Sequence, residues 1–153
     1  MKKNNKGFTL VELIVVLVIL AILAAILTPA LLGYIDRARA EKDYSTAQTV
    51  RVAAQAAIDQ AYGYGVKPDD GSTTVANIGA MTGTISGTVG GTMNKYQQLV
   101  FTLATVQTVS SNTGKGVYSY SFNYTNGIIT GGNVVINGST YKLDGGSWSV
   151  SNN

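Results

Sequence analysis

The chain of 153 residues contains neither cysteine nor histidine. The first absence excludes disulfide frameworks and thiol nucleophiles, and the two together exclude the usual zinc ligand sets. The missing histidine also removes the commonest general base. Charged residues make up 12% of the chain, about half of the usual share. A composition this poor in charge excludes a disordered acidic or basic tail.

The few charges are unevenly placed. Lys2, Lys3 and Lys6 precede Gly7 and account for the whole formal net charge of +3, since the other basic side chains balance the 8 acidic ones. The basicity therefore belongs to the N-terminus. It gives no evidence of a specific nucleic-acid site.

The main positive feature is the apolar stretch over residues 8–32. It holds 25 residues with one charged side chain, Glu12, and its apolar residues run unbroken from Leu13 to Leu27. As a helix it would be about 37 Å long, enough for a hydrocarbon core of about 30 Å. Because the lysines precede it, we expect a single membrane pass with the N-terminus in the cytoplasm.

Two simpler interpretations of this stretch remain open: a secretory signal peptide and a plain single-pass anchor. Ala38-Arg39-Ala40 has the small-x-small pattern of a signal cleavage site. It lies eleven residues beyond Leu27, farther than signal peptides usually allow, and the apolar core carries a carboxylate near its start. The sequence therefore disfavours the signal peptide.

Glu12 favours a third interpretation, in which the span is also an assembly element. An ionised carboxylate in a membrane span costs about 2.5–3.5 kcal/mol, so Glu12 lies either in the hydrated interface or near a cation. Cleavage after Gly7 would give Phe8 a free α-amino group, which is mostly positive at neutral pH. In an apolar environment, Glu12 of one subunit would select a neighbour's Phe8 amine at its own depth. Such a pair would fix the register between subunits.

The run KGFTLVEL around Gly7 closely resembles the prepilin motif of type IV pilins and pseudopilins. The resemblance implies that a prepilin peptidase cuts the Gly7–Phe8 bond and that the new Phe8 amine is methylated. It also implies that Glu12 is the assembly carboxylate. The leader of residues 1–7, with phenylalanine following it, is similar to the type IVa class.

We expect one long helix over residues 8–62, with residues 8–32 as the membrane or filament-core segment. No glycine or proline occurs between residues 36 and 62, and alanine is abundant there. Pro29 is similar to the family's helix-kinking proline, and Gly33 loosens the same region. Together they predict a bend in the helix.

The second half of this helix has an amphipathic pattern. One face carries Tyr44, Ala47, Val50, Ala54, Ala57, Ile58 and Ala61. The other face carries Glu41, Gln48, Gln55 and Asp59. The spacing of four residues also predicts weak ion pairs between Arg37 and Glu41, and between Arg39 and Asp43.

The sequence pattern of residues 63–153 predicts a β-rich head. Tyr118, Tyr120, Phe122 and Tyr124 alternate with polar residues, which indicates a strand whose aromatic side faces the core. Hairpin turns are indicated at Asn126-Gly127 and Asn137-Gly138. Gly145-Gly146 precedes a last strand over residues 147–150. We expect three to five antiparallel strands packed on the amphipathic half of the helix, which makes the fold class α+β and pilin-like.

The middle of the head is less determined. Residues 73–92 are rich in glycine and threonine and favour no single element. Residues 94–106 suit either a helix or a strand, because their apolar spacing is near-helical while their threonine and valine content favours β-structure.

The head offers few residues for chemistry. Beyond the helix, its carboxylates are Asp69, Asp70 and Asp144, and no phosphate loop, nucleophile elbow or carboxylate pair occurs. We therefore expect no enzymatic activity, no cofactor and no metal. A calcium site built from Asp69, Asp70 and backbone carbonyls is the alternative.

The resemblance implies a structural subunit of a type IV pilus, held in the cytoplasmic membrane before assembly and then part of an extracellular filament at the cell surface. Its partners would be copies of itself, the prepilin peptidase and the pilus assembly machinery. A pseudopilin of a type II secretion or competence system is the alternative. A secreted or anchored β-domain that binds carbohydrate through exposed tyrosine and tryptophan is a third hypothesis.

The chain departs from the family in one respect. Many Gram-negative type IV pilins close a C-terminal loop with a disulfide, and this chain has no cysteine to form one. Motility, adhesion, DNA uptake and secretion all use such filaments, and the weakly charged head favours none of them over the others.

Overall fold

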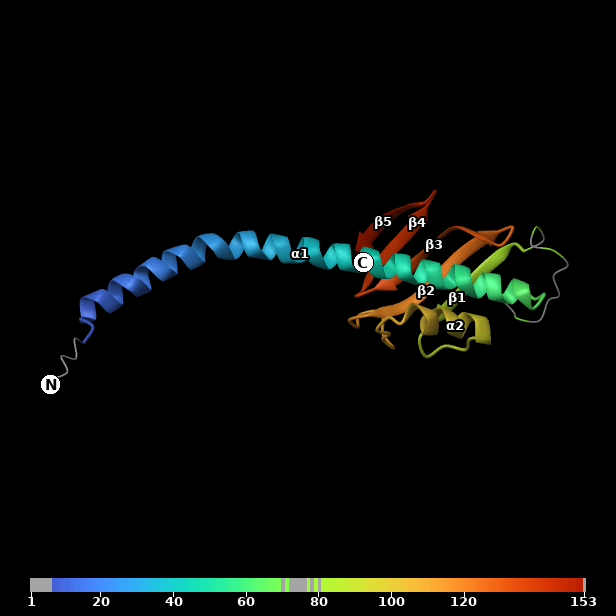
Figure 1. Cartoon of the computed structure of the whole chain (residues 1–153), viewed down its shortest axis with the longest axis horizontal. Coiled ribbons are helices and arrows are strands. Elements are labelled where there is room, and N and C mark those ends of the chain that lie inside the picture. The colour runs from blue at the N-terminus through green and yellow to red at the C-terminus, as the bar shows by residue number, and fades with distance from the viewer. Residues whose placement is uncertain (1–6, 70, 72–76, 78, 80, 153) are drawn as a thin grey trace, which may run out of the picture. The chain divides into compact units, whose positions relative to one another are not determined.

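A computed structural model describes residues 7–69, 71, 77, 79 and 81–152. Its elements follow in the order α1 (Leu10–Gly63), β1 (Gly83–Thr88), α2 (Lys95–Ala104), β2 (Val117–Thr125), β3 (Ile128–Ile136), β4 (Ser139–Asp144) and β5 (Ser147–Asn152) (Figure 1). A long helix with a five-stranded antiparallel sheet confirms the expected α+β class. The chain divides into two compact units, Met1–Glu41 and Lys42–Asn153.

Helix α1 runs for 54 residues, close to the predicted range. It continues as an α-helix through Pro29 and Gly33, so neither residue ends it. The bend expected at these two positions stays a prediction.

The C-terminal end of α1 is closed by a Schellman motif. The N–H of Gly65, which has a φ of 69°, donates to the Tyr62 carbonyl at 2.8 Å. The N–H of Val66 donates to the Ala61 carbonyl at 3.1 Å. This pair of bonds satisfies carbonyls that the last helical turn leaves open, and it places Gly65 in the conformation that glycine adopts most easily.

The five strands form a meander in which each strand pairs antiparallel with its neighbours in the chain. Two of its turns are asparagine–glycine pairs. Asn126 and Gly127 have φ values of 54° and 74°, and Asn137 and Gly138 have 54° and 85°. Positive φ at both central residues is the geometry of the type I′ turn, whose twist matches that of the flanking strands. The hairpins predicted at these dipeptides are confirmed.

Strand β2 supplies the aromatic part of the core. Tyr120, Phe122 and Tyr124 are buried, as their alternation predicts. Tyr118 departs from the row and is partly buried, because the register with β3 shifts between Val117 and Ser119 and turns Val117 into the core in its place.

The head unit packs α1 on one face of the sheet. The predicted stripe is confirmed: Ala47, Val50, Ala54, Ala57, Ile58 and Ala61 are buried, together with Ala53. Tyr44 is partly buried and lies edge-on to Tyr141 from β4, with ring centroids 5.3 Å apart. The small alanine side chains bring the helix close to the aromatic residues of the sheet.

Residues 94–106 contain a helix and not a strand. The Asn94 side chain accepts the N–H groups of Tyr96 and Gln97 at 2.9 and 3.0 Å, and the Gln97 side chain accepts the Asn94 N–H at 2.8 Å. This reciprocal capping box satisfies the first backbone donors of α2 and favours the helix over the strand.

Two glutamines predicted on the other face of α1 reach the sheet with their side-chain amides, although Gln48 is exposed. Gln48 accepts the indole N–H of Trp148 at 3.0 Å. Gln55 donates to the Gly127 carbonyl at 2.7 Å and accepts the Ile129 N–H at 3.0 Å. Both side chains flank the buried stripe, and their amides reach past its edge to the strands.

The predicted ion pairs along α1 are also corrected, since neither Arg37 with Glu41 nor Arg39 with Asp43 forms one among the described residues. Arg39 lies 3.6 Å from Asp36 and not beside Asp43. Asp43 instead accepts two hydrogen bonds from the Asn137 side chain in the β3–β4 turn. Asp43 therefore ties α1 to the β3–β4 turn.

Candidate functional site

The N-terminal end of α1 is built around Thr9 and Glu12. The Thr9 N–H donates to Glu12 Oε2 at 2.9 Å, and the Thr9 hydroxyl donates to the same oxygen at 2.7 Å. In return, Thr9 Oγ1 accepts the Glu12 N–H at 3.3 Å. Thr9 is therefore the N-cap and Glu12 the third helical residue of a capping box. The helix begins at Leu10 and not at Phe8 because Thr9 adopts the cap position.

Thr9 is a residue of this site that the sequence-based prediction missed, because Glu12 was considered only as a charge in need of a partner. The spacing Thr-x-x-Glu just ahead of an apolar run is the signal that identifies it. The cap gives Glu12 two donors within its own chain. It therefore reduces the cost of carrying a carboxylate at the edge of an apolar helix.

Gly7 and Phe8 lie before the first helical turn. Both are exposed, Phe8 by 81%, and neither belongs to a helix or strand. A Cβ placed on Gly7 would meet no atom within 4 Å. The bond between them is thus open to an enzyme's active site, while the lysines of the leader fall outside the described residues.

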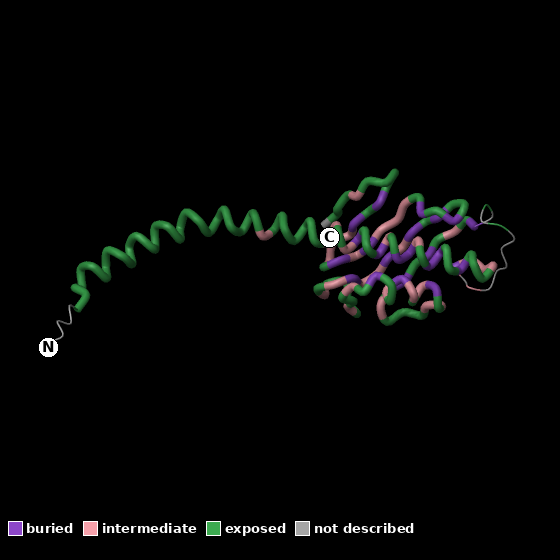
Figure 2. Tube along the Cα trace, in the orientation of Figure 1, coloured by how far each residue is buried: buried purple, intermediate pink, exposed green. Residues whose placement is uncertain are grey.

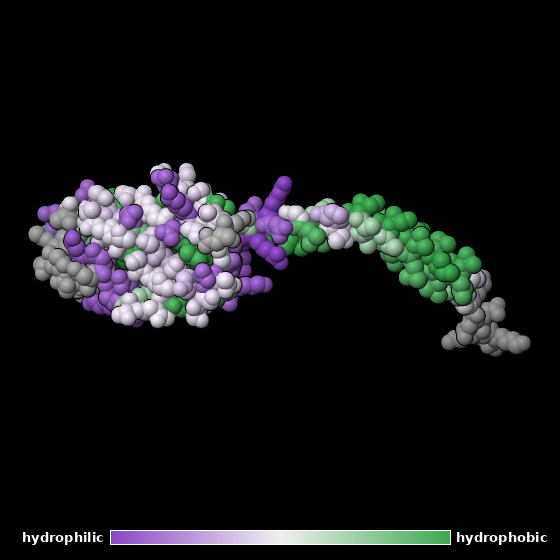
Figure 3. All heavy atoms as spheres, turned by 180° about the vertical axis from the view of Figure 1, so that it is seen from behind, coloured by the Kyte–Doolittle hydropathy of each residue, from purple (hydrophilic) through white to green (hydrophobic). Residues whose placement is uncertain are grey.

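The first half of α1 is an apolar surface without cover in its own unit. Every leucine, isoleucine and valine in residues 8–32 is at least half exposed (Figure 2). Figure 3 shows apolar side chains covering the visible side of this segment. By length and composition it can cross a membrane, with a mean hydropathy of 3.3 over its most apolar window. Exposed apolar surface of this extent marks a membrane or protein interface.

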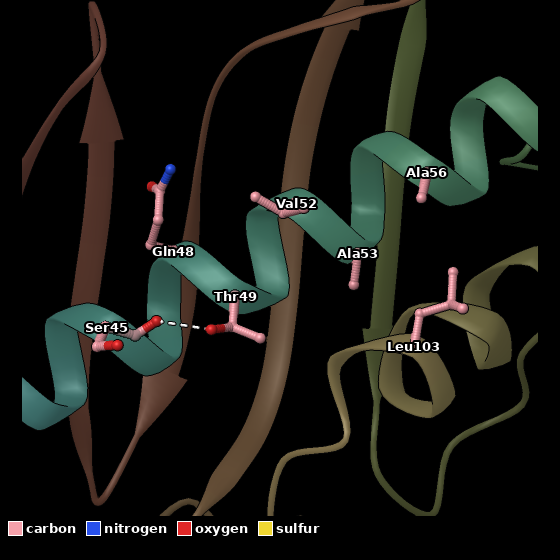
Figure 4. Close-up of a pocket in the computed structure, with 7 residues that line it drawn as sticks. All are labelled: Ser45, Gln48, Thr49, Val52, Ala53, Ala56 and Leu103. Carbon is pink, nitrogen blue, oxygen red and sulfur yellow. Dashed lines mark hydrogen bonds between the residues drawn. The ribbon is translucent and has the colours of Figure 1, made fainter.

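A second apolar surface lies in the head unit between α1 and α2. It is an open groove lined by Ser45, Gln48, Thr49, Val52, Ala53, Ala56 and Leu103 (Figure 4). Val52 is 59% exposed and Leu103 is 46% exposed, one from each helix. The lining contains no charged side chain, so the groove suits an apolar partner.

Tyr120, Phe122 and Tyr124 of β2 belong to the core and do not form a ligand surface. Burial raises the pKa of Tyr120, and its hydroxyl donates to the Gln97 carbonyl at 2.6 Å. Trp148 is partly buried and packs edge-on to Phe122, with ring centroids 6.4 Å apart. These rings are therefore occupied by packing contacts.

Metal ligands are scarce in the described part of the chain, where no group of three or more histidine, cysteine, aspartate or glutamate side chains could hold an ion. Asp69, one half of the alternative calcium site, accepts the Tyr124 hydroxyl at 3.2 Å. The other half, Asp70, lies outside the described residues.

Comparison with family models gives one match, the prokaryotic N-terminal methylation motif over residues 2–28. No curated protein and no solved structure matches the chain. The matched region contains the Gly7–Phe8 bond, the Thr9–Glu12 cap and most of the exposed apolar segment. The chain therefore carries the prepilin leader of the type IV pilins and pseudopilins, followed by a long apolar helix, and this leader implies processing by a prepilin peptidase.

Proposed function

We propose that the chain is a structural subunit of a type IV pilus, cut after Gly7 and polymerised from the cytoplasmic membrane into a filament at the cell surface. The supporting observation is the exposed apolar helix of residues 10–32, which carries one carboxylate at its first turn. In a membrane anchor alone, that carboxylate would serve only as a helix cap, a role that a neutral glutamine can also fill. A subunit that must dock in one register also needs its charge.

The geometry of the cap supports a specific docking step. Both bonds from Thr9 end on Oε2 of Glu12, and no hydrogen bond to Oε1 occurs among the described residues. Oε1 could then accept a hydrogen bond from a second chain. Processing would expose the Phe8 amine of that second chain. In the dry core of a helical bundle the ion pair stabilises the correct register, and a shifted register leaves both charges unpaired.

Repetition of this contact would build the filament. The amine of one subunit and the carboxylate of the next are different surfaces, so the contact is heterologous and an open helical assembly results. The groove beside Val52 and Leu103 would be covered in the same assembly by the apolar helix of a neighbouring subunit. No step of this mechanism needs a catalytic residue or a cofactor in the chain.

The proposal is tested by determining, in the native cell, where the mature chain begins and whether it forms surface filaments. Sheared surface filaments would be purified, and the intact mass and N-terminal sequence of this chain would be measured in the filaments and in the membrane fraction. A chain that begins at a methylated Phe8 and is abundant in long filaments supports the pilus subunit. The same mature chain without surface filaments indicates a pseudopilin. An uncut chain, or one cut beyond Ala40, contradicts both.

A further inference from the structure

The two asparagine–glycine turns of the head have the same backbone and different surroundings. Asn126-Gly127 and Asn137-Gly138 are both type I′ turns with closely similar φ values. Asparagine followed by glycine is the dipeptide most prone to deamidation, because glycine has no Cβ to hinder its backbone nitrogen. That nitrogen attacks the side-chain amide carbon, ammonia leaves, and water opens the resulting succinimide to aspartate or isoaspartate.

The Asn137 side chain is held by α1. Its Nδ2 donates to both carboxylate oxygens of Asp43, at 2.8 and 2.9 Å. The Tyr141 hydroxyl donates to the same carboxylate at 3.2 Å, and the Asn137 N–H donates to the Gly116 carbonyl at 3.0 Å. The amide is therefore fixed by charge-assisted bonds, although Asn137 itself is exposed to water.

The other turn is held differently. No hydrogen bond of the Asn126 side chain occurs among the described residues, and Asn126 is exposed. Here the N–H of Gly127, the nitrogen that would attack, donates to the Met81 carbonyl at 2.9 Å. The two turns can therefore be compared within one protein. In the Asn137-Gly138 turn the side-chain amide is hydrogen-bonded, whereas in the Asn126-Gly127 turn the backbone N–H that would attack is hydrogen-bonded.

We propose that Asn137-Gly138 is a site of spontaneous deamidation whose rate is set by Asp43. Attack requires the Asn137 amide to swing toward the Gly138 nitrogen, which breaks both bonds to Asp43. Donation from Nδ2 to a carboxylate also increases the double-bond character of the amide C–N bond and makes its carbon less electrophilic.

Deamidation would replace the attraction between Asn137 and Asp43 by repulsion. A carboxylate at position 137 would face Asp43 at hydrogen-bond distance, and two carboxylates this close cannot both stay ionised without strong repulsion. The tie between the β3–β4 turn and α1 is then lost. Because the reaction needs only water and no enzyme, the deamidated fraction of the protein increases with its age.

The experiment compares the full chain in detergent with its Asp43→Ala variant during incubation at mildly alkaline pH, with peptide mapping of both turns over time. We expect deamidation at Asn137 to be roughly tenfold faster or more in the variant, which corresponds to about 1.4 kcal/mol of lost ground-state stabilisation. The rate at Asn126 should not change. An unchanged rate at Asn137 beside an unchanged rate at Asn126 overturns the proposal.

The deamidation rate at Asn126 also shows whether the Asp43→Ala substitution has destabilised the head as a whole, since general destabilisation would increase the rate at both turns. In that case Asp43→Asn decides, because it keeps the size of the side chain and one carbonyl acceptor but loses the charge. A rate at Asn137 above that of the parent, with Asn126 unchanged, supports the role of the carboxylate. A parental rate at Asn137 in this variant contradicts it.

Discussion

Gln55 in α1 binds the backbone of Ile129 as a neighbouring strand would. Its Oε1 accepts the Ile129 N–H at 3.0 Å, while its Nε2 donates to the Gly127 carbonyl at 2.7 Å and to Asp59 at 3.0 Å. One side-chain amide thus satisfies a donor and an acceptor at the start of β3. The pairing fixes the β2–β3 turn on the helix without an ion pair.

Replacement of Gln55 by alanine should therefore destabilise the head by about 1–3 kcal/mol, because it leaves two partly buried backbone groups without partners. The free energy of unfolding, measured by denaturant titration, tests this expectation. Gln60→Ala is the matched control, since Gln60 lies on the same helix and is exposed. Equal effects of the two substitutions would show that the contacts of Gln55 contribute nothing.

The role of Gln55 also shows what the sequence could and could not predict. The long helix and the hairpins follow from local signals: an unbroken apolar and alanine-rich run, and asparagine–glycine pairs between alternating strands. Helical periodicity places Gln55 beside the buried stripe. It cannot say that a turn 72 residues away offers that side chain a carbonyl.

The candidate site shows a similar division. The charge pattern around Gly7 and Glu12 identifies the N-terminal segment without any tertiary information, because its chemistry is local in sequence. Tyr118 departs from the aromatic row because of a register shift in the β2–β3 pair. Such a shift cannot be recognised from the alternation of polar and apolar residues within one strand. Thr9 was within reach of the sequence, since its spacing from Glu12 is that of a capping box.

Thr9→Val tests the cap. The substitution keeps the shape of the side chain and removes the hydroxyl that donates to Glu12 at 2.7 Å. This bond holds the Glu12 carboxylate at the start of the helix, so we expect filament yield to fall while processing after Gly7 continues. Thr28→Val is the control, because the Thr28 hydroxyl bonds its own helix at the Ala24 carbonyl. Filament yields that match between the two variants would exclude a role for the cap.

Substitutions of Glu12 separate the cap from the charge. Glu12→Ala removes both and should leave processing and membrane insertion intact while preventing normal assembly. Glu12→Gln keeps a carbonyl that can accept from Thr9 but cannot form an ion pair with a neighbour's Phe8 amine. We expect the glutamine variant to be processed normally and to assemble poorly. Normal filaments from either variant, in cells without the parent chain, would contradict the register mechanism.

Val52→Asp tests the groove between α1 and α2. Val52 is 59% exposed, so the charge should change the free energy of unfolding by less than about 0.5 kcal/mol. A neighbour's apolar helix in the groove would bury that charge at a cost of several kcal/mol, and filament yield should fall sharply. Gln60→Asp adds the same charge to α1 outside the groove and should assemble as the parent does. Parental yield from Val52→Asp would show that no apolar partner covers the groove.

Alkaline pH should weaken the head through Tyr141. Burial raises the pKa of Tyr141 to about 12, with the neighbouring Asp43 carboxylate adding to the effect. In the unfolded chain the same hydroxyl loses its proton near pH 10. The unfolded state therefore binds fewer protons between about pH 10 and 12, so the free energy of unfolding falls across that window. Below it, the contribution of Tyr141 is fully present and does not change with pH. Denaturant titrations from pH 8 to 12 should show a shallower decline for Tyr141→Phe than for the parent, and parallel declines would contradict this assignment.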